Sequence, residues 1–343
     1  MARNTPWLNQ VQEKTIDPGM PICDPHHHLW EFKHERVADR YLMNEILEDL
    51  NSGHNIVSTV FIEAHAMHRK GGPAHLRVVG ETEFVNGISA MSASGLYGDT
   101  KIAAGIVGTV DLTLGAKKAA ETLDAHIVAG GGPKGRFRGI RQIATWDPHP
   151  DVYNGRANPQ PGMYLDPKFR EGFAELAPRN LTFDAWCYFH QIPDVTDLAK
   201  AFPDTKIVLN HFGGPVMTGH YADRKDEVFK QWRKNMTALS KCPNVYAKLG
   251  GLNMHYIGFG WEFRPLPPTS DELVKAYRRY FGHTIEKFGP DRCMFESNFP
   301  VDMISCSYNV LWNANKKMVK GASAGEKAAM FHDTATKFYR LDA

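Results

Sequence analysis

The sequence lacks the features that mark several large classes of protein. Its 343 residues contain no run of about 18 uninterrupted apolar residues, and the initial segment MARNTPWLNQ has no apolar core of the kind found in signal peptides. We therefore expect a soluble, cytoplasmic protein. Forty basic and 38 acidic residues give a formal net charge of +2 without a dense Lys or Arg run, which argues against nucleic acid or a membrane surface as partner.

Cysteine is also scarce, whereas histidine is abundant. The five cysteines form an odd and widely spaced set, so reduced thiols are expected rather than a disulfide framework. The sixteen histidines include three in succession, His26, His27 and His28. A small molecule is the partner class that remains, and nothing in the sequence specifies or forbids a homodimer.

Short apolar runs rich in β-branched or aromatic residues alternate with longer amphipathic stretches along the chain. Eight strand-helix units in about 320 residues predict an α/β fold, the (β/α)8 TIM barrel, with extra helices at the C-terminus. The eight runs span residues 20–24, 56–63, 101–110, 137–143, 181–188, 206–210, 245–249 and 293–297.

The alternative fold is a doubly wound open sheet, which normally shows a glycine-rich phosphate-binding turn directly after its first strand. Residues 24–28 (DPHHH) stand in that position instead. No internal repeat and no low-complexity segment is present. We therefore expect a single domain covering residues 1–343, with an N-terminal extension at 1–19 and the barrel at 20–340.

Two glycine patterns match known motifs in the wrong context. Residues 130–135 (GGGPKG) satisfy G-x-G-x-x-G but follow a predicted helix and precede a strand, the reverse of a dinucleotide-binding turn. Residues 321–325 (GASAG) satisfy G-x-S-x-G, but Ser323 stands three residues before Glu326, a pattern typical of a helix capping box. Neither pattern predicts a catalytic function.

Histidines at strand ends are the first candidates for chemistry. His26 and His28 are two residues apart at the end of the first strand, so they point to one side and His27 points to the other. His211 ends the sixth strand. Imidazoles at the mouth of a barrel can hold a divalent cation or hydrogen-bond a carbonyl oxygen.

Other strands carry polar side chains in apolar surroundings. Asp184 in the fifth strand and Lys248 in the seventh need a partner or a substrate group if they are buried. Glu296 and Asn298 share one face at the end of the eighth strand. Groups from strands one, five, six, seven and eight therefore converge on one end of the barrel, as a single active site requires.

The loops after the strands supply further candidates, because these loops build the active sites of barrels. The longest are residues 147–164, 212–224 and 253–270, and the last is rich in aromatic residues. We interpret it as a pocket wall or lid, in preference to a subunit contact. The candidate substrate-binding residues in the loops are His190, Gln191, His255, Tyr256, Trp261 and Arg264.

The chain resembles the amidohydrolase-related barrel family (amidohydrolase 2), and specifically its lactonase-like branch, which includes fuconolactonase, sulfomuconolactonase and pyrone-dicarboxylate lactonase. The motifs lie in order along nearly the whole chain. They are DPHHHLW at 24–30, FRGIR at 137–141, FDAW at 183–186, NHFGGP at 210–215, KLGG at 248–251 and FESNFP at 295–300.

The resemblance implies a centre made of the H-x-H pair, the strand-six histidine and an acid after strand eight, which serves as metal ligand or base. His26, His28 and His211 match this pattern and are the metal ligands that it implies. Asn298, however, stands where the family usually has Asp. A two-metal site is not expected, because strand four has no lysine or glutamate. We favour an enzyme without a strict metal requirement, with one zinc ion as the alternative.

The missing acid shifts attention to other carboxylates, because a neutral amide cannot accept a proton. Glu296 is the first candidate base, Asp184 the second and Asp302 the third. Cationic anchors for a carboxylate-bearing substrate are expected among Arg138, Arg141, Lys248 and Arg264.

The sequence thus predicts a hydrolase of carboxylic esters that opens an anionic lactone of a sugar-acid or aromatic-catabolism type. The first alternative is a zinc-dependent decarboxylase or C–C hydrolase. The second is a catalytically impaired barrel that only binds a small molecule.

Overall fold

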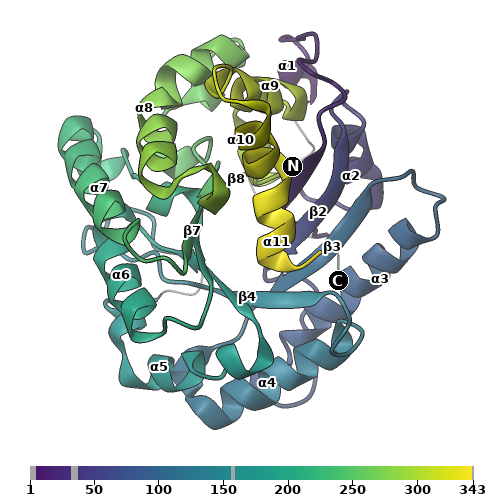
Figure 1. Cartoon of the computed structure of the whole chain (residues 1–343), viewed down its shortest axis with the longest axis vertical. Helices are drawn as coiled ribbons and strands as arrows, with labels where there is room; N and C mark the ends of the chain where they lie inside the picture. The colour runs from purple at the N-terminus through teal and green to yellow at the C-terminus, as the bar shows by residue number, and fades with distance from the viewer. Residues whose placement is uncertain (1–4, 32–37, 156–158, 342–343) are drawn as a thin grey trace.

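Eight parallel strands form one sheet in the order of the sequence, from β1 to β8. The computed structural model describes residues 5–31, 38–155 and 159–341. A parallel bridge between His27 and Phe299 joins the first strand to the segment after the last one, so the barrel is nearly closed (Figure 1). This confirms the predicted (β/α)8 TIM barrel. The strands are β1 Ile22–His27, β2 Ile56–Ile62, β3 Lys101–Gly108, β4 Phe137–Ile143, β5 Thr182–Trp186, β6 Ile207–Leu209, β7 Val245–Leu249 and β8 Cys293–Phe295.

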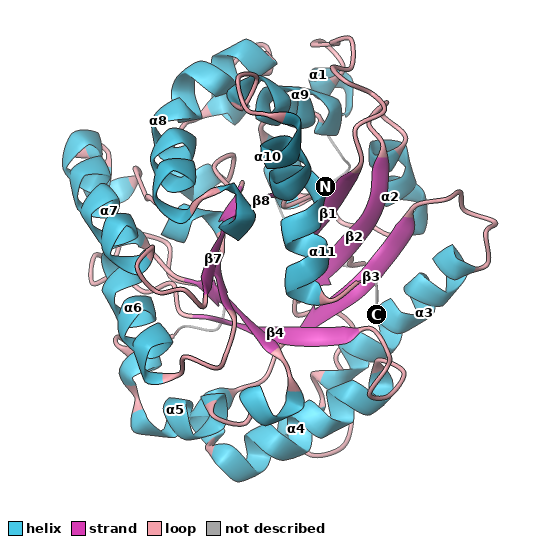
Figure 2. Cartoon of the chain, in the orientation of Figure 1, coloured by secondary structure: helices cyan, strands magenta, loops and turns pink. Residues whose placement is uncertain are grey.

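Helices surround the strands on the outside, as Figure 2 shows. Their amphipathic sequences bury an apolar face against the sheet, and α8 begins with a capping box in which Thr269 and Glu272 satisfy the first free N–H groups. The helices are α1 Thr5–Leu8, α2 Met43–Leu50, α3 Val79–Ala93, α4 Ala116–Ala129, α5 Pro167–Phe173, α6 Ile192–Ala201, α7 Lys225–Leu239, α8 Ser270–Phe288, α9 Tyr308–Met318, α10 Ala324–Ala328 and α11 Thr334–Tyr339.

The ends of β1 and β8 differ from the predicted ranges for one physical reason. The N–H of Glu296 still bonds to Leu249 O of β7 (3.4 Å), but beyond it the chain bonds to β1: the N–H of Asn298 donates to His26 O (2.9 Å) and the N–H of His28 donates to Phe299 O (2.8 Å). Strand β1 therefore extends to His27, and Glu296 lies just beyond β8. This closure carries the residues after both strands toward the same point.

The C-terminal helix α11 closes the barrel at the N-terminal ends of the strands. It lies across this end of the sheet in Figure 1. Its buried side chains, Phe338 and Tyr339 among them, form a cluster with the lumen residues Val60, Val208 and Met294. The mouth at the opposite end, where the strands finish, is left for the active site.

The N-terminal segment packs against the helices next to β8. The Glu13 carboxylate accepts hydrogen bonds from Ser270 and Asn313, and the Lys316 ammonium donates to the carbonyls of residues 16 and 17. The five cysteines are buried and unpaired. None of the described helices has the length and apolarity needed to cross a membrane.

The two misleading glycine motifs occupy the structural positions that were expected of them. Residues 130–135 link the end of α4 to the start of β4. Ser323 is the N-cap of α10 and forms a capping box with Glu326, so the G-x-S-x-G pattern marks a helix start.

Candidate active site

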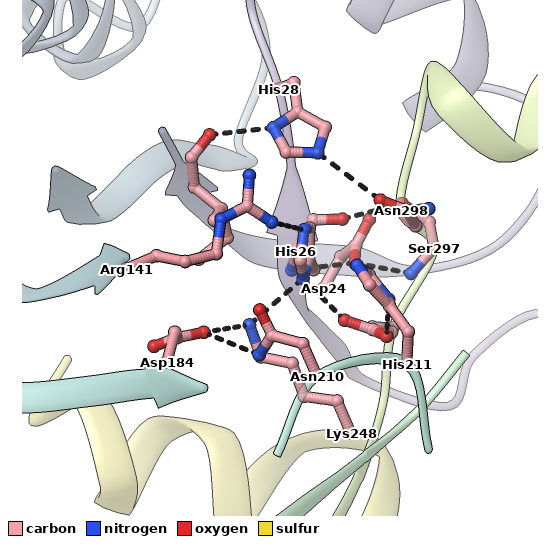
Figure 3. A network of polar contacts seen from close by, with 12 residues as sticks. Asp24, His26, His28, Arg141, Asp184, Asn210, His211, Lys248, Ser297 and Asn298 are labelled. Atoms are coloured by element: carbon pink, nitrogen blue, oxygen red, sulfur yellow. Dashed lines mark hydrogen bonds and ion pairs between the residues drawn. The ribbon is translucent and has the colours of Figure 1, made fainter. Parts of the chain in front are cut away.

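Three buried side chains meet at the centre of the barrel mouth, from β1, from the end of β6 and from the end of β8. The carboxylate of Glu296 lies between two imidazoles: Oε1 is 2.6 Å from His211 Nδ1 and Oε2 is 2.7 Å from His26 Nδ1. The Oε2 contact is poorly aligned, so this buried oxygen has no hydrogen-bond partner of good geometry. The rings of His26 and His211 have centroids 4.5 Å apart. Figure 3 shows how His26 and His211 lie beside each other.

Two consecutive glycines after β7 make room for this centre. A Cβ atom on Gly250 would lie 2.4 Å from Glu296 Cγ, and a Cβ atom on Gly251 would lie 2.2 Å from His211 Nδ1. Gly251 also has a φ of +73°, which L side chains rarely adopt. Glycine is therefore required at positions 250 and 251, because any side chain there would displace the Glu296 carboxylate or the His211 imidazole.

Two site residues are held in a left-handed backbone conformation. His211 has φ +52° and Asn298 has φ +57°. Non-glycine residues adopt such values rarely, and residues of this kind cluster at active sites where the surrounding structure enforces them. Trp186 packs against the His211 ring in a T-shaped contact, with a distance of 4.7 Å between the ring centroids, which helps to hold the imidazole in place.

Burial pushes these ionisable groups toward their uncharged forms. It raises the pKa of Glu296 to about 8, although the charge of Lys248 opposes the shift. Burial also lowers the pKa of His211 well below its usual value, assisted by the charges of Arg141 and Lys248. At neutral pH the carboxyl group of Glu296 therefore keeps its proton beside a neutral imidazole, and this proton is lost only at mildly alkaline pH.

Asp184 and Lys248 form an ion pair beneath His26, on the side of α11. Lys248 Nζ lies 2.7 Å from Asp184 Oδ2 and 3.2 Å from His26 Nδ1, and neither side chain is exposed. Asn210 and Tyr339 donate further hydrogen bonds to the same carboxylate. Figure 3 shows Lys248 and His28 on opposite sides of His26. The pair therefore supports the centre from below instead of facing the mouth.

Arg141 is in the site, and its partner is a residue that the sequence analysis did not single out. Its Nε donates to Glu63 Oε1 (2.7 Å), and NH1 lies 3.3 Å from His26 Nε2. Glu63 is fully buried, and although burial opposes it, the charge of Arg141 lowers the pKa of Glu63 to about 2. A charged residue at the end of the apolar run 56–63 was the signal that could have revealed it.

His28 and Asn298 meet at the other side of His26. His28 Nε2 lies 3.3 Å from Asn298 Oδ1, and Asn298 Nδ2 donates to Asp302 Oδ1 (2.7 Å). Asp302, the third candidate base, is brought close to the centre by a turn at Val301–Ile304. The Asn298 amide thus connects His28 to the buried Asp302. A carboxylate at position 298 would instead be repelled by Asp302.

The loop residues after β5 lie at the rim. Gln191 uses its side chain to bond the backbone of Ala144, Trp146 and Tyr188, which fixes the loop instead of presenting an open amide. His190 is hydrogen-bonded to Asp147, which also accepts from Tyr221. These contacts connect the loops that follow β4, β5 and β6.

The loop at 253–270 divides into two parts. Tyr256 stacks on Tyr153 and contacts Tyr188, from the loops after β4 and β5, so it contributes to the rim. Trp261 and Arg264 instead contact α8, through Tyr277 and Glu272. His255 pairs with Glu262 inside its own loop.

Two strand residues, Arg138 and His27, lie away from the centre. Arg138 lies at the closed end of the barrel, where its guanidinium donates to Gly135 O, so it is not brought to the mouth. His27 points away from its two neighbours, as expected, and its Nε2 contacts Thr59 Oγ1 (2.9 Å). Arg138 is the second residue of β4, and Arg141 is the fifth, which explains why only Arg141 reaches the site.

The donor atoms of His26, His211 and Glu296 lie within 4.8 Å of one another and have the types that zinc prefers. His28 is not in this group. Both ring nitrogens of His26 also face a cationic side chain, Lys248 at 3.2 Å and Arg141 at 3.3 Å. Each of these cations is paired with a carboxylate, Asp184 for Lys248 and Glu63 for Arg141, so they add little net charge to the centre. A metal ion bound by His26 would have to displace Lys248 from Nδ1 or Arg141 from Nε2.

Comparison with known proteins places this barrel in a family. A model of the family described as amidohydrolase matches residues 23–341. The chain belongs to the amidohydrolase family. An uncharacterised protein of Sinorhizobium fredii is 32% identical over 338 residues, which cover 93% of this chain and 98% of that protein.

Relatives named as lactonases are more distant. An L-fucono-1,5-lactonase of Burkholderia multivorans is 28% identical over 177 residues, 51% of this chain and 57% of that protein. An L-rhamnono-gamma-lactonase of Scheffersomyces stipitis is 24% identical over 186 residues, 52% of each chain. These relatives support a hydrolase that acts on a small molecule.

A solved structure with the same fold is a Burkholderia multivorans amidohydrolase with bound HEPES. It has a TM-score of 0.71 and 22% identity, and the match covers 93% of this chain and 99% of that one. A 2,6-dihydroxybenzoate decarboxylase from Rhizobium has a TM-score of 0.56 at 12% identity, covering 94% and 99%. At these identities the structures show a shared barrel only.

Proposed function

We propose that this amidohydrolase opens a neutral lactone of a sugar acid by water attack, with Glu296 and His211 as a paired general base. The observation that carries the proposal is the 2.6 Å contact between Glu296 Oε1 and His211 Nδ1 in a fully buried setting. A carboxylate on Nδ1 holds the proton there and leaves Nε2 as the acceptor. Among the described residues, none forms a hydrogen bond with Nε2 of His211.

The reaction needs one proton acceptor and one stabilised oxyanion. His211 Nε2 takes a proton from water as the water oxygen attacks the lactone carbonyl carbon. The carbonyl oxygen becomes an oxyanion, which we assign to the Arg141 guanidinium, because Arg141 is 5% exposed while Lys248 is fully buried. When the C–O bond breaks, His211 returns the proton to the departing ring oxygen, and a hydroxy acid is formed.

The charges at the site favour a neutral substrate over the anionic lactone that the sequence predicted. Each cation near the centre already has a carboxylate partner: Asp184 for Lys248 and Glu63 for Arg141. Arg264 pairs with Glu272 against α8. A substrate carboxylate would therefore meet only cations that are already paired, whereas the hydroxyl groups of a sugar lactone suit the tyrosines and histidines of the rim. The relatives named as sugar-acid lactonases agree with this choice.

A substrate panel tests the proposal. Acid release is followed in a pH-stat with neutral five- and six-membered sugar lactones, with lactones that carry an extra carboxylate, and with aromatic acids assayed for CO₂ release. We expect turnover of neutral lactones. Turnover confined to carboxylated lactones would overturn the substrate class, and CO₂ release without lactone opening would favour the decarboxylase. Binding without any turnover would favour the impaired barrel.

A further inference from the structure

The C-terminal helix reaches the active site from the closed end of the barrel. Tyr339 is the last residue of α11, and its side chain enters the lumen with no exposed surface. Its hydroxyl group lies 3.0 Å from Asp184 Oδ1 and 2.9 Å from Asp184 Oδ2. The face of its ring lies near Lys248, with Nζ 5.4 Å from the ring centroid. One side chain therefore contacts both members of the buried ion pair.

The ion pair in turn contacts the centre. Lys248 Nζ lies 3.2 Å from His26 Nδ1, which is 2.7 Å from Glu296 Oε2. Asp184 Oδ2 accepts from Lys248, Asn210 and Tyr339, whereas Oδ1 accepts from Tyr339 alone among the described residues. The Tyr339 hydroxyl is thus the contact that fixes the rotation of the Asp184 carboxylate and, with it, the place of the ammonium.

We infer that Tyr339 is a positioning residue of the active site, which holds the Asp184–Lys248 pair so that the ammonium stays against His26. The inference adds to the proposed function a residue from the opposite end of the barrel. The kinetic test of the inference rests on the proposed function, whereas the NMR test does not.

The backbone around Tyr339 is built to hold this side chain in place. Arg340 has φ +55° and ends the helix, and the N–H of Leu341 bonds back to Thr336 O (3.0 Å). The Arg340 guanidinium donates to Arg138 O (3.1 Å) at the start of β4. These contacts attach the end of α11 to the barrel wall, so the depth of the tyrosine in the lumen is fixed.

The test compares Tyr339→Phe with Tyr246→Phe. Both variants lose one tyrosine hydroxyl at the same end of the barrel, and Tyr246 packs against Phe338 without reaching Asp184. Ring ¹⁵N NMR signals of His26, assigned with a His26→Asn variant, report on the ammonium contact without any substrate. We expect Tyr339→Phe to shift them and Tyr246→Phe to leave them in place.

Kinetics on the best lactone of the panel give the second readout. A hydrogen bond to a charged group corresponds to about tenfold to a hundredfold in an equilibrium. We expect Tyr339→Phe to lower kcat by about tenfold at unchanged KM, because Tyr339 does not touch substrate. Unchanged His26 signals in a folded Tyr339→Phe protein would overturn the inference, whatever the substrate is.

A second variant covers the case in which Tyr339→Phe does not fold. Asp184→Asn breaks the same connection from β5 while it keeps the shape of the side chain. Shifted His26 signals in this variant support the connection through Asp184, and unchanged signals overturn it. Shifted His26 signals in the variants, together with a wild-type protein that turns over no lactone, would contradict the proposed function. Tyr339 would still be a positioning residue.

Discussion

Glu296 Oε1 lies 2.6 Å from His211 Nδ1, and Gly250 and Gly251 pack directly against these two side chains. The contact joins residues that are 85 positions apart in the chain and come from the ends of two different strands. Because burial raises the pKa of Glu296 to about 8, the pair holds a second proton at neutral pH and releases it only at mildly alkaline pH. This relationship leads to the first prediction.

The pH dependence of kcat/KM should show an acidic limb with an apparent pKa near 8. Below that pH the pair holds one more proton, so Nε2 of His211 is protonated and cannot act as the base; above it Nε2 is free, so activity rises with pH. Initial rates on a neutral lactone, corrected for spontaneous opening, measure the profile. A limb near the ordinary pKa of a glutamate, about 4.3, would contradict this prediction.

Alanine at Gly250 or Gly251 should remove most of the activity. The new Cβ atom would lie 2.4 Å from Glu296 Cγ or 2.2 Å from His211 Nδ1, so the pair must move apart. Gly282→Ala, in α8, is the matched control because nothing lies within 4 Å of its Cβ position. It should keep full activity and gain about 0.4–1 kcal/mol in stability, measured by urea unfolding. Full activity in both Gly250→Ala and Gly251→Ala would be inconsistent with the site.

The ion pair beneath His26 should show strong coupling in stability. Lys248→Met leaves Asp184 charged and buried without its cation, which typically costs about 3–5 kcal/mol. The double variant Lys248→Met/Asp184→Leu should recover much of the loss, because no buried charge remains, but it should stay inactive. Urea unfolding of the two single variants and the double variant measures the coupling. Additive losses would show that the two residues do not interact.

Removal of metal ions should leave lactone turnover intact. The reason is that Lys248 and Arg141 already contact the two ring nitrogens of His26, so neither nitrogen is left open to a metal ion. The protein is treated with a chelator, its metal content is measured, and turnover is compared before and after zinc is added back. Loss of activity on chelation and its return with zinc would contradict the prediction.

The barrel and most of the site could be predicted because both follow from local patterns. Eight apolar runs specify the strands, and polar residues at their ends, such as His26, His211 and Glu296, must meet at one mouth. The pairing of the cations could not be predicted, since Glu63 lies 78 residues from Arg141 and Asp184 lies 64 residues from Lys248.

The positions of some other side chains could not be predicted from the sequence, because they depend on how distant segments of the chain pack together. Tyr339 lies on a helix with no mark of function in its sequence, and only the packing of α11 into the lumen brings it within reach of Asp184. The choice between Arg138 and Arg141 was also hidden, because alternation along the strand indicated that at most one of them points inward but not which one.

The most direct test of the central claim is the turnover of a neutral sugar lactone by Glu296→Gln. The control is Glu262→Gln, which removes the charge from another Glu–His contact, that of Glu262 with His255 outside the centre. We predict a loss of about 10² to 10⁴ in kcat for Glu296→Gln, the usual contribution of a general base, and a change below about twofold for Glu262→Gln. Wild-type turnover in a folded Glu296→Gln protein would contradict the account.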